Sequence, residues 1–178
     1  MSREVLIGVT AGIAAYKTCT LVSRLVQAGV GVTVMMTEHA TQLVGPRTFQ
    51  SLSGRPVLVD LFEPQSRAIP HVEAAAHAQL FCIAPATANI LGKAANGLAD
   101  DLLSTTILAF EGPVLFAPAM NNHMWQNKAV ARNVAQLKAD GYHFVGPEEG
   151  YLACGSAGLG RMAEPETILA EIQRWLES

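Results

Sequence analysis

The sequence has little cysteine and lacks long apolar runs. Its three cysteines are odd in number and form no CxxC pair, which argues against a disulfide framework or a cysteine-based zinc site. The longest apolar stretches, such as Val5–Val9, are far shorter than the roughly 20 residues of a membrane-spanning helix. Met1–Glu4 runs directly into a strand-like segment and does not resemble a signal peptide. We therefore expect a cytoplasmic protein with no membrane partner.

An excess of basic charge is also missing. The 12 Lys and Arg residues against 15 Asp and Glu residues give a formal net charge of −3, so the sequence predicts no nucleic-acid partner. The histidines show neither HExxH nor HxxxH spacing, and no metal site is predicted. Hydrophobic residues make up 50% of the 178 positions. That share exceeds what a disordered chain carries and is typical of one compact domain.

Short apolar runs alternate with helical patterns along the chain, which indicates βαβ units and a mostly parallel sheet. The expected strands are Val5–Val9, Val30–Met36, Leu80–Ala84, Val114–Ala117 and Tyr142–Val145, with a weaker candidate at Val57–Asp60. The expected helices are Ile13–Gln27, Asn89–Ala95, Asp101–Phe110, Asn127–Ala139 and Pro165–Leu176. We predict a single α/β domain over residues 1–178, a three-layer, doubly wound, Rossmann-like fold.

Two segments do not fit this alternation. Glu63–Pro70 has no periodicity, and neither does Gly146–Met162, which contains five glycines. Long irregular segments within compact domains are often binding loops or lids. We expect substrate contacts in both segments, with residues 146–162 as the substrate clamp.

Three of the expected strands end in small or polar residues. Thr10–Ala15, Pro85–Asn89 and Pro118–Trp125 each lead from a strand into a helix start. The carboxyl ends of parallel strands meet at one edge, where helix N-termini favour anions. Each motif alone is compatible with tight packing or helix capping, but together they predict one ligand crevice. The absence of GxGxxG argues against NAD.

The last two of these runs, with Ala153–Gly155 and Gly158–Met162, resemble the motifs of the flavin-containing cysteine decarboxylases. Within that family the similarity is greatest to the branch that acts on phosphopantothenoylcysteine in coenzyme A biosynthesis, and it covers nearly the whole chain. The resemblance implies bound FMN and a carboxy-lyase. In its reaction the substrate thiol is oxidised, carbon dioxide leaves the thioaldehyde, and the enethiol is reduced to 4′-phosphopantetheine.

The resemblance also implies roles for individual residues. His71 would be the base in thiol oxidation, Asn121 would hold the substrate carboxylate, and Cys154 would protonate the enethiolate. Met124 and Arg161 would join Asn121 as substrate contacts, with Arg161 either on the phosphate or bracing the clamp. FMN would contact Ala11, Gly12, Ile13, Thr37, Ala40, Phe49, Thr87, Ala88, Asn89, Ile90 and Ala119. We expect the other thiols to be inert, since Cys19 lies in a helix pattern and Cys82 in an apolar strand.

Members of the family are homo-oligomers, so a trimer or a dodecamer built from trimers is expected, with FMN between subunits. The resemblance further implies a phosphopantothenate–cysteine ligase, either as a separate partner or as a fused domain. Two alternatives stay open: a peptidyl-cysteine decarboxylase, and a non-catalytic flavin-binding regulatory subunit. The motif around Asn121 argues against a flavin prenyltransferase, and the combination of His71, Asn121 and Cys154 favours catalysis.

Overall fold

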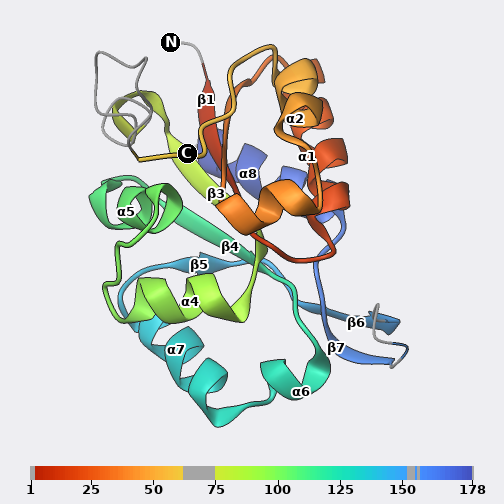
Figure 1. The fold of residues 1–178 in the computed structure, drawn as a ribbon, viewed down its shortest axis with the longest axis vertical. Helices are drawn as coiled ribbons and strands as arrows, with labels where there is room; N and C mark the ends of the chain where they lie inside the picture. Colours follow the sequence, from red (N-terminus) through yellow and green to blue (C-terminus); the bar gives the residue numbers. More distant parts are fainter. Residues whose placement is uncertain (1–2, 62–74, 152–154, 156, 178) are drawn as a thin grey trace.

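A parallel sheet forms the centre of the computed structural model, which describes residues 3–61, 75–151, 155 and 157–177 (Figure 1). Its strand order is β2-β1-β3-β4-β5, so the direction of winding reverses between β1 and β3. The strands are β1 (Glu4–Val9), β2 (Gly31–Met36), β3 (Leu80–Ala86), β4 (Val114–Pro118) and β5 (His143–Phe144).

Both faces of the sheet are covered, which explains why its strands are continuous apolar runs. In β1, Val5, Ile7 and Val9 pack into one core cluster and Leu6 into the other. β3 alternates in the same way, with Cys82 on the first side and Phe81 on the second. Successive side chains of each strand therefore pack against the helices of opposite layers.

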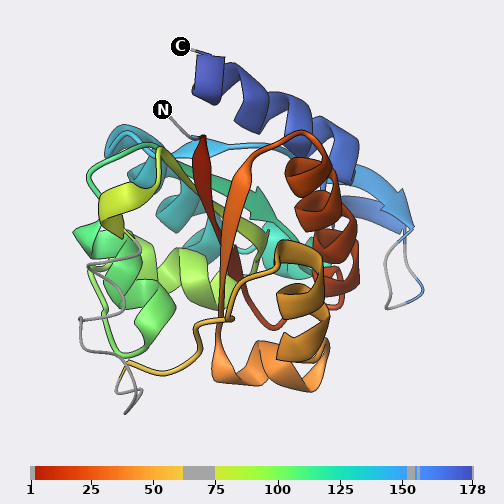
Figure 2. The same ribbon diagram turned by 90° about the horizontal axis from the view of Figure 1, so that it is seen from above.

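The helices form two layers around the sheet (Figure 2). The first layer contains α1 (Ala15–Gln27), α2 (Pro46–Ser53) and α8 (Pro165–Glu177). The second contains α4 (Ala88–Ala95), α5 (Leu102–Ala109) and α7 (Lys128–Ala139). Two short elements, η1 (Glu38–Gln42) and α6 (Asn122–Trp125), follow the ends of β2 and β4. No helix within the described ranges is long and apolar enough to cross a membrane.

The predicted fold class is confirmed, and the five principal strands and five helices are present. α1 begins at Ala15 rather than Ile13, because the preceding residues form the turn that leaves β1. The weaker strand candidate Val57–Asp60 makes only one parallel bridge, from Leu58 to Met35. α2 was not predicted, and the irregular segment Glu63–Pro70 lies outside the described residues.

The expectation of irregular structure over residues 146–162 was wrong. β6 (Glu148–Tyr151) and β7 (Ala157–Arg161) pair as an antiparallel hairpin. The hairpin lacks apolar alternation because glycines, rather than large side chains, face its neighbours. Gly158 lies against the side chain of Asn122. The backbone of the hairpin makes these contacts, so its sequence lacks the alternating apolar residues from which a strand is predicted.

Gly160 holds this hairpin on the end of β4. Its carbonyl accepts a hydrogen bond from the backbone N–H of Met120 at 2.9 Å. Its φ is +151°, and a β-carbon would overlap the carbonyl oxygen of Met120. Only glycine permits this approach, because any larger residue must push the two backbones apart.

We expect Gly160→Ala to detach the hairpin from the β4–α6 turn at a cost on the order of 1–3 kcal/mol. Hydrogen exchange at the Met120 amide should accelerate, because its acceptor moves away. Gly45→Ala is the control, since Gly45 has a φ of −65° and open space around it. Unchanged protection of Met120 in Gly160→Ala would show that the hairpin is docked by other contacts.

Candidate active site

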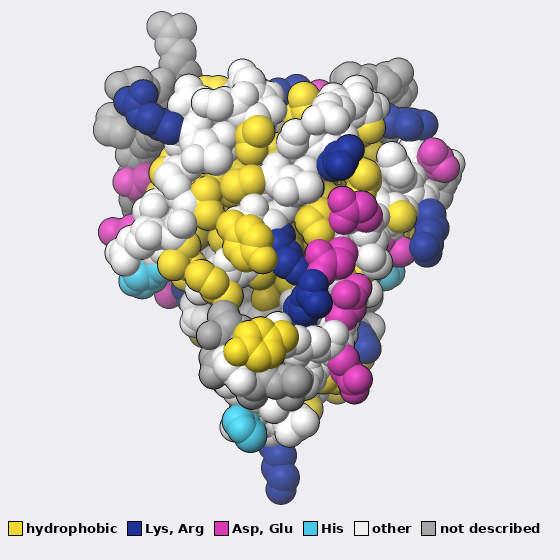
Figure 3. Space-filling view, turned by 90° about the vertical axis from the view of Figure 1, so that its right-hand side faces the viewer, with side chains coloured by type: hydrophobic (Ala, Val, Ile, Leu, Met, Phe, Trp, Pro, Cys, Tyr) yellow, Lys and Arg dark blue, Asp and Glu magenta, His cyan; other side chains and the backbone are white. Residues whose placement is uncertain are grey.

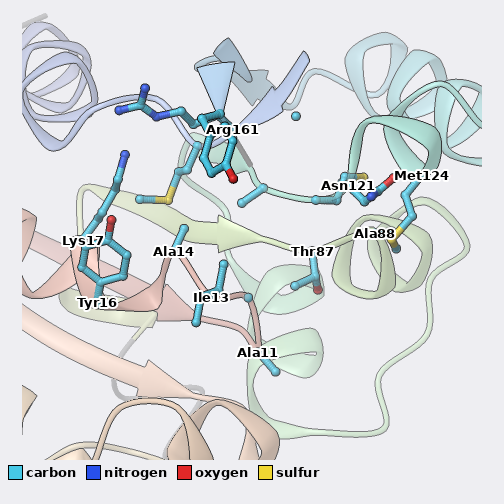
Figure 4. Close-up of a pocket in the computed structure, with 16 residues that line it drawn as sticks. Ala11, Ile13, Ala14, Tyr16, Lys17, Thr87, Ala88, Asn121, Met124 and Arg161 are labelled. Carbon is cyan, nitrogen blue, oxygen red and sulfur yellow. The ribbon is translucent and has the colours of Figure 1, made fainter. Parts of the chain in front are cut away.

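A cavity of about 680 Å³ lies at the carboxyl ends of the central strands, where the winding reverses (Figure 4). The turns after β1, β3 and β4 supply its floor and one end, and the β6–β7 hairpin closes the other side. Its lining residues are Ala11, Gly12, Ile13, Ala14, Tyr16, Lys17, Thr87, Ala88, Ala119, Met120, Asn121, Met124, Tyr151, Gly160, Arg161 and Met162. The expected crevice is thus formed by all three predicted turns.

Two buried threonines join the turns after β1 and β3. The Thr10 hydroxyl donates to the carbonyl of Pro85 at 2.7 Å and accepts from the backbone N–H of Thr87 at 3.2 Å. Thr18 on α1 donates its hydroxyl to the carbonyl of Ala84 at 2.8 Å. These bonds satisfy backbone groups at the irregular end of β3 and fix the two turns to each other.

Two helix N-termini face this floor. α1 has no side-chain cap, and Gly12, just before it, lies so close to Pro85 that a β-carbon would be 3.2 Å from the proline ring. α4 is capped by Thr87, whose side-chain oxygen accepts from the Ile90 N–H. Backbone amides and helix dipoles at such termini stabilise negative charge, so this floor suits a phosphate group.

Asn121 lies at one end of the cavity, where it also caps α6. Its Oδ1 accepts a hydrogen bond from the backbone N–H of His123 at 2.8 Å. The cap fixes the orientation of the amide, because its oxygen is held by the helix N-terminus while its nitrogen carries the donors of the group. Asn121 can therefore cap the helix through its oxygen and bind a ligand through its nitrogen, so the two roles are compatible.

Three charged side chains lie at the opposite end. Lys17 Nζ is 3.0 Å from Glu164 Oε1, and Arg161 pairs with the same carboxylate oxygen. The hydrogen bond from Lys17, with smaller contributions from the charges of Lys17 and Arg161, lowers the pKa of Glu164 below its usual value. Glu164 therefore stays ionised at neutral pH, and the group carries two positive charges and one negative charge.

The structure brings together many of the residues predicted for the site. Those that line the cavity are Ala11, Gly12, Ile13, Thr87, Ala88, Ala119, Asn121, Met124 and Arg161. His71 and Cys154 lie outside the described residues.

The other predicted cofactor contacts do not line the cavity. The Thr37 side chain caps η1, while Ala40, Phe49 and Ile90 are buried in the core. Asn89 is exposed on the first turn of α4. Their contacts with a cofactor stay predictions.

Sequence reasoning missed several lining residues, among them Tyr16, Lys17 and Tyr151. The first two follow Ile13 by three and four positions, so helical spacing places them on the same side of α1. The helical spacing from Ile13 could therefore have predicted both as lining residues. Tyr151 had no comparable signal, because its position depends on the hairpin.

Cys82 is not a candidate nucleophile. It is fully buried in β3, and burial raises the pKa of its thiol to about 12. Burial also raises the pKa of Cys19 on α1. Both thiols stay protonated at neutral pH, as expected of inert cysteines. Among the described residues, no group of three or more His, Cys, Asp or Glu side chains is arranged to hold a metal ion.

Sequence comparison relates nearly the whole chain to known proteins. The profile of the family described as Flavoprotein matches residues 1–177. A coenzyme A biosynthesis bifunctional protein CoaBC from Bacillus subtilis (strain 168) is 54% identical over 169 residues, 94% of this chain and 42% of that protein. The CoaBC of Mycobacterium tuberculosis (strain H37Rv) is 46% identical over 175 residues, with coverages of 98% and 42%. The chain thus spans less than half the length of these relatives.

Solved structures share the fold over all or nearly all of the chain. A cysteine-to-serine mutant of PPC decarboxylase in complex with pantothenoylaminoethenethiol superposes with a TM-score of 0.89 at 28% identity, covering 100% of both chains. The FMN-dependent cysteine decarboxylase SpaF has a TM-score of 0.82 at 35% identity, covering 97% of each chain.

Proposed function

Since the chain belongs to the Flavoprotein family, we propose that it binds FMN and converts 4′-phosphopantothenoylcysteine to 4′-phosphopantetheine in coenzyme A biosynthesis. The resemblance that the sequence motifs indicated is confirmed by this membership. The observation that carries the proposal is the cavity, which has Asn121 at one end and paired cations at the other, in a chain 54% identical to a CoaBC protein. The activity is that of a carboxy-lyase.

The lining residues fit FMN. The cavity volume of about 680 Å³ lies within the roughly 300–1,000 Å³ typical of small-molecule sites. Ala11, Gly12 and Thr87 with the following helix N-termini would hold the cofactor phosphate, and Ala119 and Met120 offer an apolar wall for a ring. FMN supplies a two-electron acceptor that takes electrons from the substrate thiol end and returns them, so the overall reaction has no net oxidation.

The protein's own contribution is to bind, orient and protonate the substrate. The net reaction replaces a carboxylate by hydrogen, releases carbon dioxide and consumes one proton. Asn121 can orient the carboxylate through Nδ2 without adding a charge that would retain it. The resemblance assigns the base to His71 and the acid to Cys154.

The first alternative is a decarboxylase of peptides that end in cysteine. The likeness to SpaF, a cysteine decarboxylase, supports it. The higher identity to the CoaBC proteins, 54% and 46%, favours the phosphopantothenoyl substrate. The second alternative is a non-catalytic flavin-binding subunit. Such a subunit would use Asn121 only to cap α6. Asn121 also lines the cavity, which supports a role in binding substrate and so favours the enzyme.

The β6–β7 hairpin is proposed as the substrate clamp, within a single domain over residues 1–178. It contributes Tyr151 and Arg161 to the cavity and contacts the β4–α6 turn through Gly160. The bifunctional relatives also support a link to a phosphopantothenate–cysteine ligase, fused or separate. The cytoplasmic location stays a prediction.

The direct test is to incubate the purified protein with phosphopantothenoylcysteine and identify the products by mass spectrometry. We expect a yellow protein that releases FMN, together with carbon dioxide and 4′-phosphopantetheine. A cysteine-terminated peptide is the competing substrate. A protein that takes up no FMN, or that decarboxylates only the peptide, would refute the proposal.

Cys154→Ser should separate two stages of the reaction. Carbon dioxide should still be released in a single turnover, but proton donation should become slow, because a serine hydroxyl is far less acidic than a thiol with a pKa of about 8.5. The enethiol, lighter than 4′-phosphopantetheine by one pair of hydrogen atoms, should accumulate. Cys82→Ser is the control. Normal product from Cys154→Ser at the wild-type rate would assign the proton to another group.

We also propose a homo-oligomer, a trimer or a dodecamer of trimers, with FMN near the subunit contact. Apolar side chains gather on the face that carries α1, α2 and the hairpin (Figure 3). Ile13, Tyr16 and Tyr151 are 64%, 60% and 75% exposed although they line the cavity. A second copy would cover them. Light scattering of the flavin-loaded protein should give a multiple of the 18.9 kDa chain mass; a monomer would contradict this.

A further inference from the structure

We propose that Lys17 and Arg161, joined through Glu164, form the subsite for the phosphate of the substrate and so select phosphorylated pantothenoylcysteine. The inference rests on the proposed function and extends it to two residues, Lys17 and Glu164, that the sequence motifs did not single out.

The three side chains come from segments that only the fold brings together. Lys17 is on α1, Arg161 ends β7, and Glu164 precedes α8. Lys17 Nζ donates to Glu164 Oε1 at 3.0 Å, and the Arg161 guanidinium pairs with the same oxygen. The Lys17 side chain is only 13% exposed. Burying this cation costs desolvation free energy, which an ion partner or an anionic ligand offsets.

The charges at this end are not balanced within the group. Two cations share one carboxylate, Glu148 is the register partner of Arg161 in the hairpin, and both Lys17 and Arg161 line a cavity whose walls are largely apolar. A phosphate monoester carries close to two negative charges and three acceptor oxygens, so it can engage an ammonium and a guanidinium at once. Glu164 keeps the two cations together before the ligand arrives.

The group lies at the end of the cavity away from Asn121 and Met124, with the Lys17 ammonium and the Arg161 guanidinium on the same side (Figure 4). Phosphopantothenoylcysteine carries its reacting carboxylate at one end and its phosphate at the other. With the carboxylate at Asn121, an extended substrate directs its phosphate toward Lys17 and Arg161. One substrate would then bridge α1 and the hairpin.

The cofactor phosphate is a second source of the same chemistry. The floor at Gly12 and Thr87 already offers two helix N-termini for it, while Lys17, in the first turn of α1, has its ammonium paired with Glu164. Arg161 also extends along Gly150, where a β-carbon would lie 2.8 Å from its Cδ, so the hairpin itself positions the guanidinium. An arginine carried on the proposed clamp suits a ligand that enters and leaves more than one that stays bound.

The test compares Lys17→Met and Arg161→Met with the wild type, on phosphopantothenoylcysteine and on pantothenoylcysteine without the phosphate. We expect the ratio of kcat/KM for the two substrates to fall about 10- to 100-fold in each variant, mainly through KM, because one charge-assisted contact is lost. Lys17→Arg should restore most of the ratio. Lys128→Met, at an exposed lysine on α7, is the matched control.

Two further measurements distinguish a substrate subsite from a structural ion pair and from a contact with the cofactor. Glu164→Gln should keep the preference for the phosphorylated substrate, since both cations remain. If Lys17→Met, Arg161→Met and Glu164→Gln each lower kcat/KM equally on the two substrates, the three residues form a structural ion pair and the proposal is overturned. Loss of flavin from Lys17→Met during gel filtration would assign the pair to the cofactor phosphate and also overturn it.

Calorimetry separates this inference from the proposed function. If the wild type decarboxylates neither substrate, the proposed function fails, but binding still tests the subsite. 4′-phosphopantetheine should bind the flavin-loaded wild type more tightly than pantetheine does, and Lys17→Met should abolish the difference. Equal binding of the two compounds to the wild type would refute the subsite.

Discussion

The buried hydroxyl of Thr10 is the contact on which the site depends. It joins the turn after β1 to the turn after β3 through the carbonyl of Pro85 and the N–H of Thr87. These turns flank the point where the winding of the sheet reverses, and both helices of the cavity floor start from them. Removing the hydroxyl would leave a buried carbonyl without its partner, at a cost of about 1–3 kcal/mol. Together with the hydrogen bond from Thr18 to the Ala84 carbonyl, this interaction holds the floor in place.

The polar groups of the cavity lie at its two ends. Asn121 is held at one end by its bond to the His123 N–H, and the Lys17, Arg161 and Glu164 group lies at the other. Apolar side chains such as Met120 and Met162 lie among the lining residues. This arrangement suits a long ligand that is anionic at both ends. One end would accept hydrogen bonds from Asn121, the other would pair with Lys17 and Arg161, and the middle would contact an apolar wall.

The hairpin opposite the floor is stabilised differently. Gly158 and Gly160 let its backbone approach Asn122 and Met120 directly, and a backbone hydrogen bond from the Met120 N–H to the Gly160 carbonyl fixes it there. None of the residues of β6 is fully buried, whereas every residue of β3 is. The hairpin thus carries Arg161 to the cavity while it is less firmly packed than the sheet.

The sequence by itself determined the layers of the fold and the place of the crevice. Apolar runs such as Val5–Val9 could be identified as buried strands because their hydrophobicity is local, and parallel strands bring their following turns to one edge. The hairpin and the partners of Lys17 could not be predicted. Lys17 and Glu164 are 147 positions apart, and the hairpin docks through backbone. Only the tertiary structure decided these features, because such contacts leave no periodic pattern in the chain.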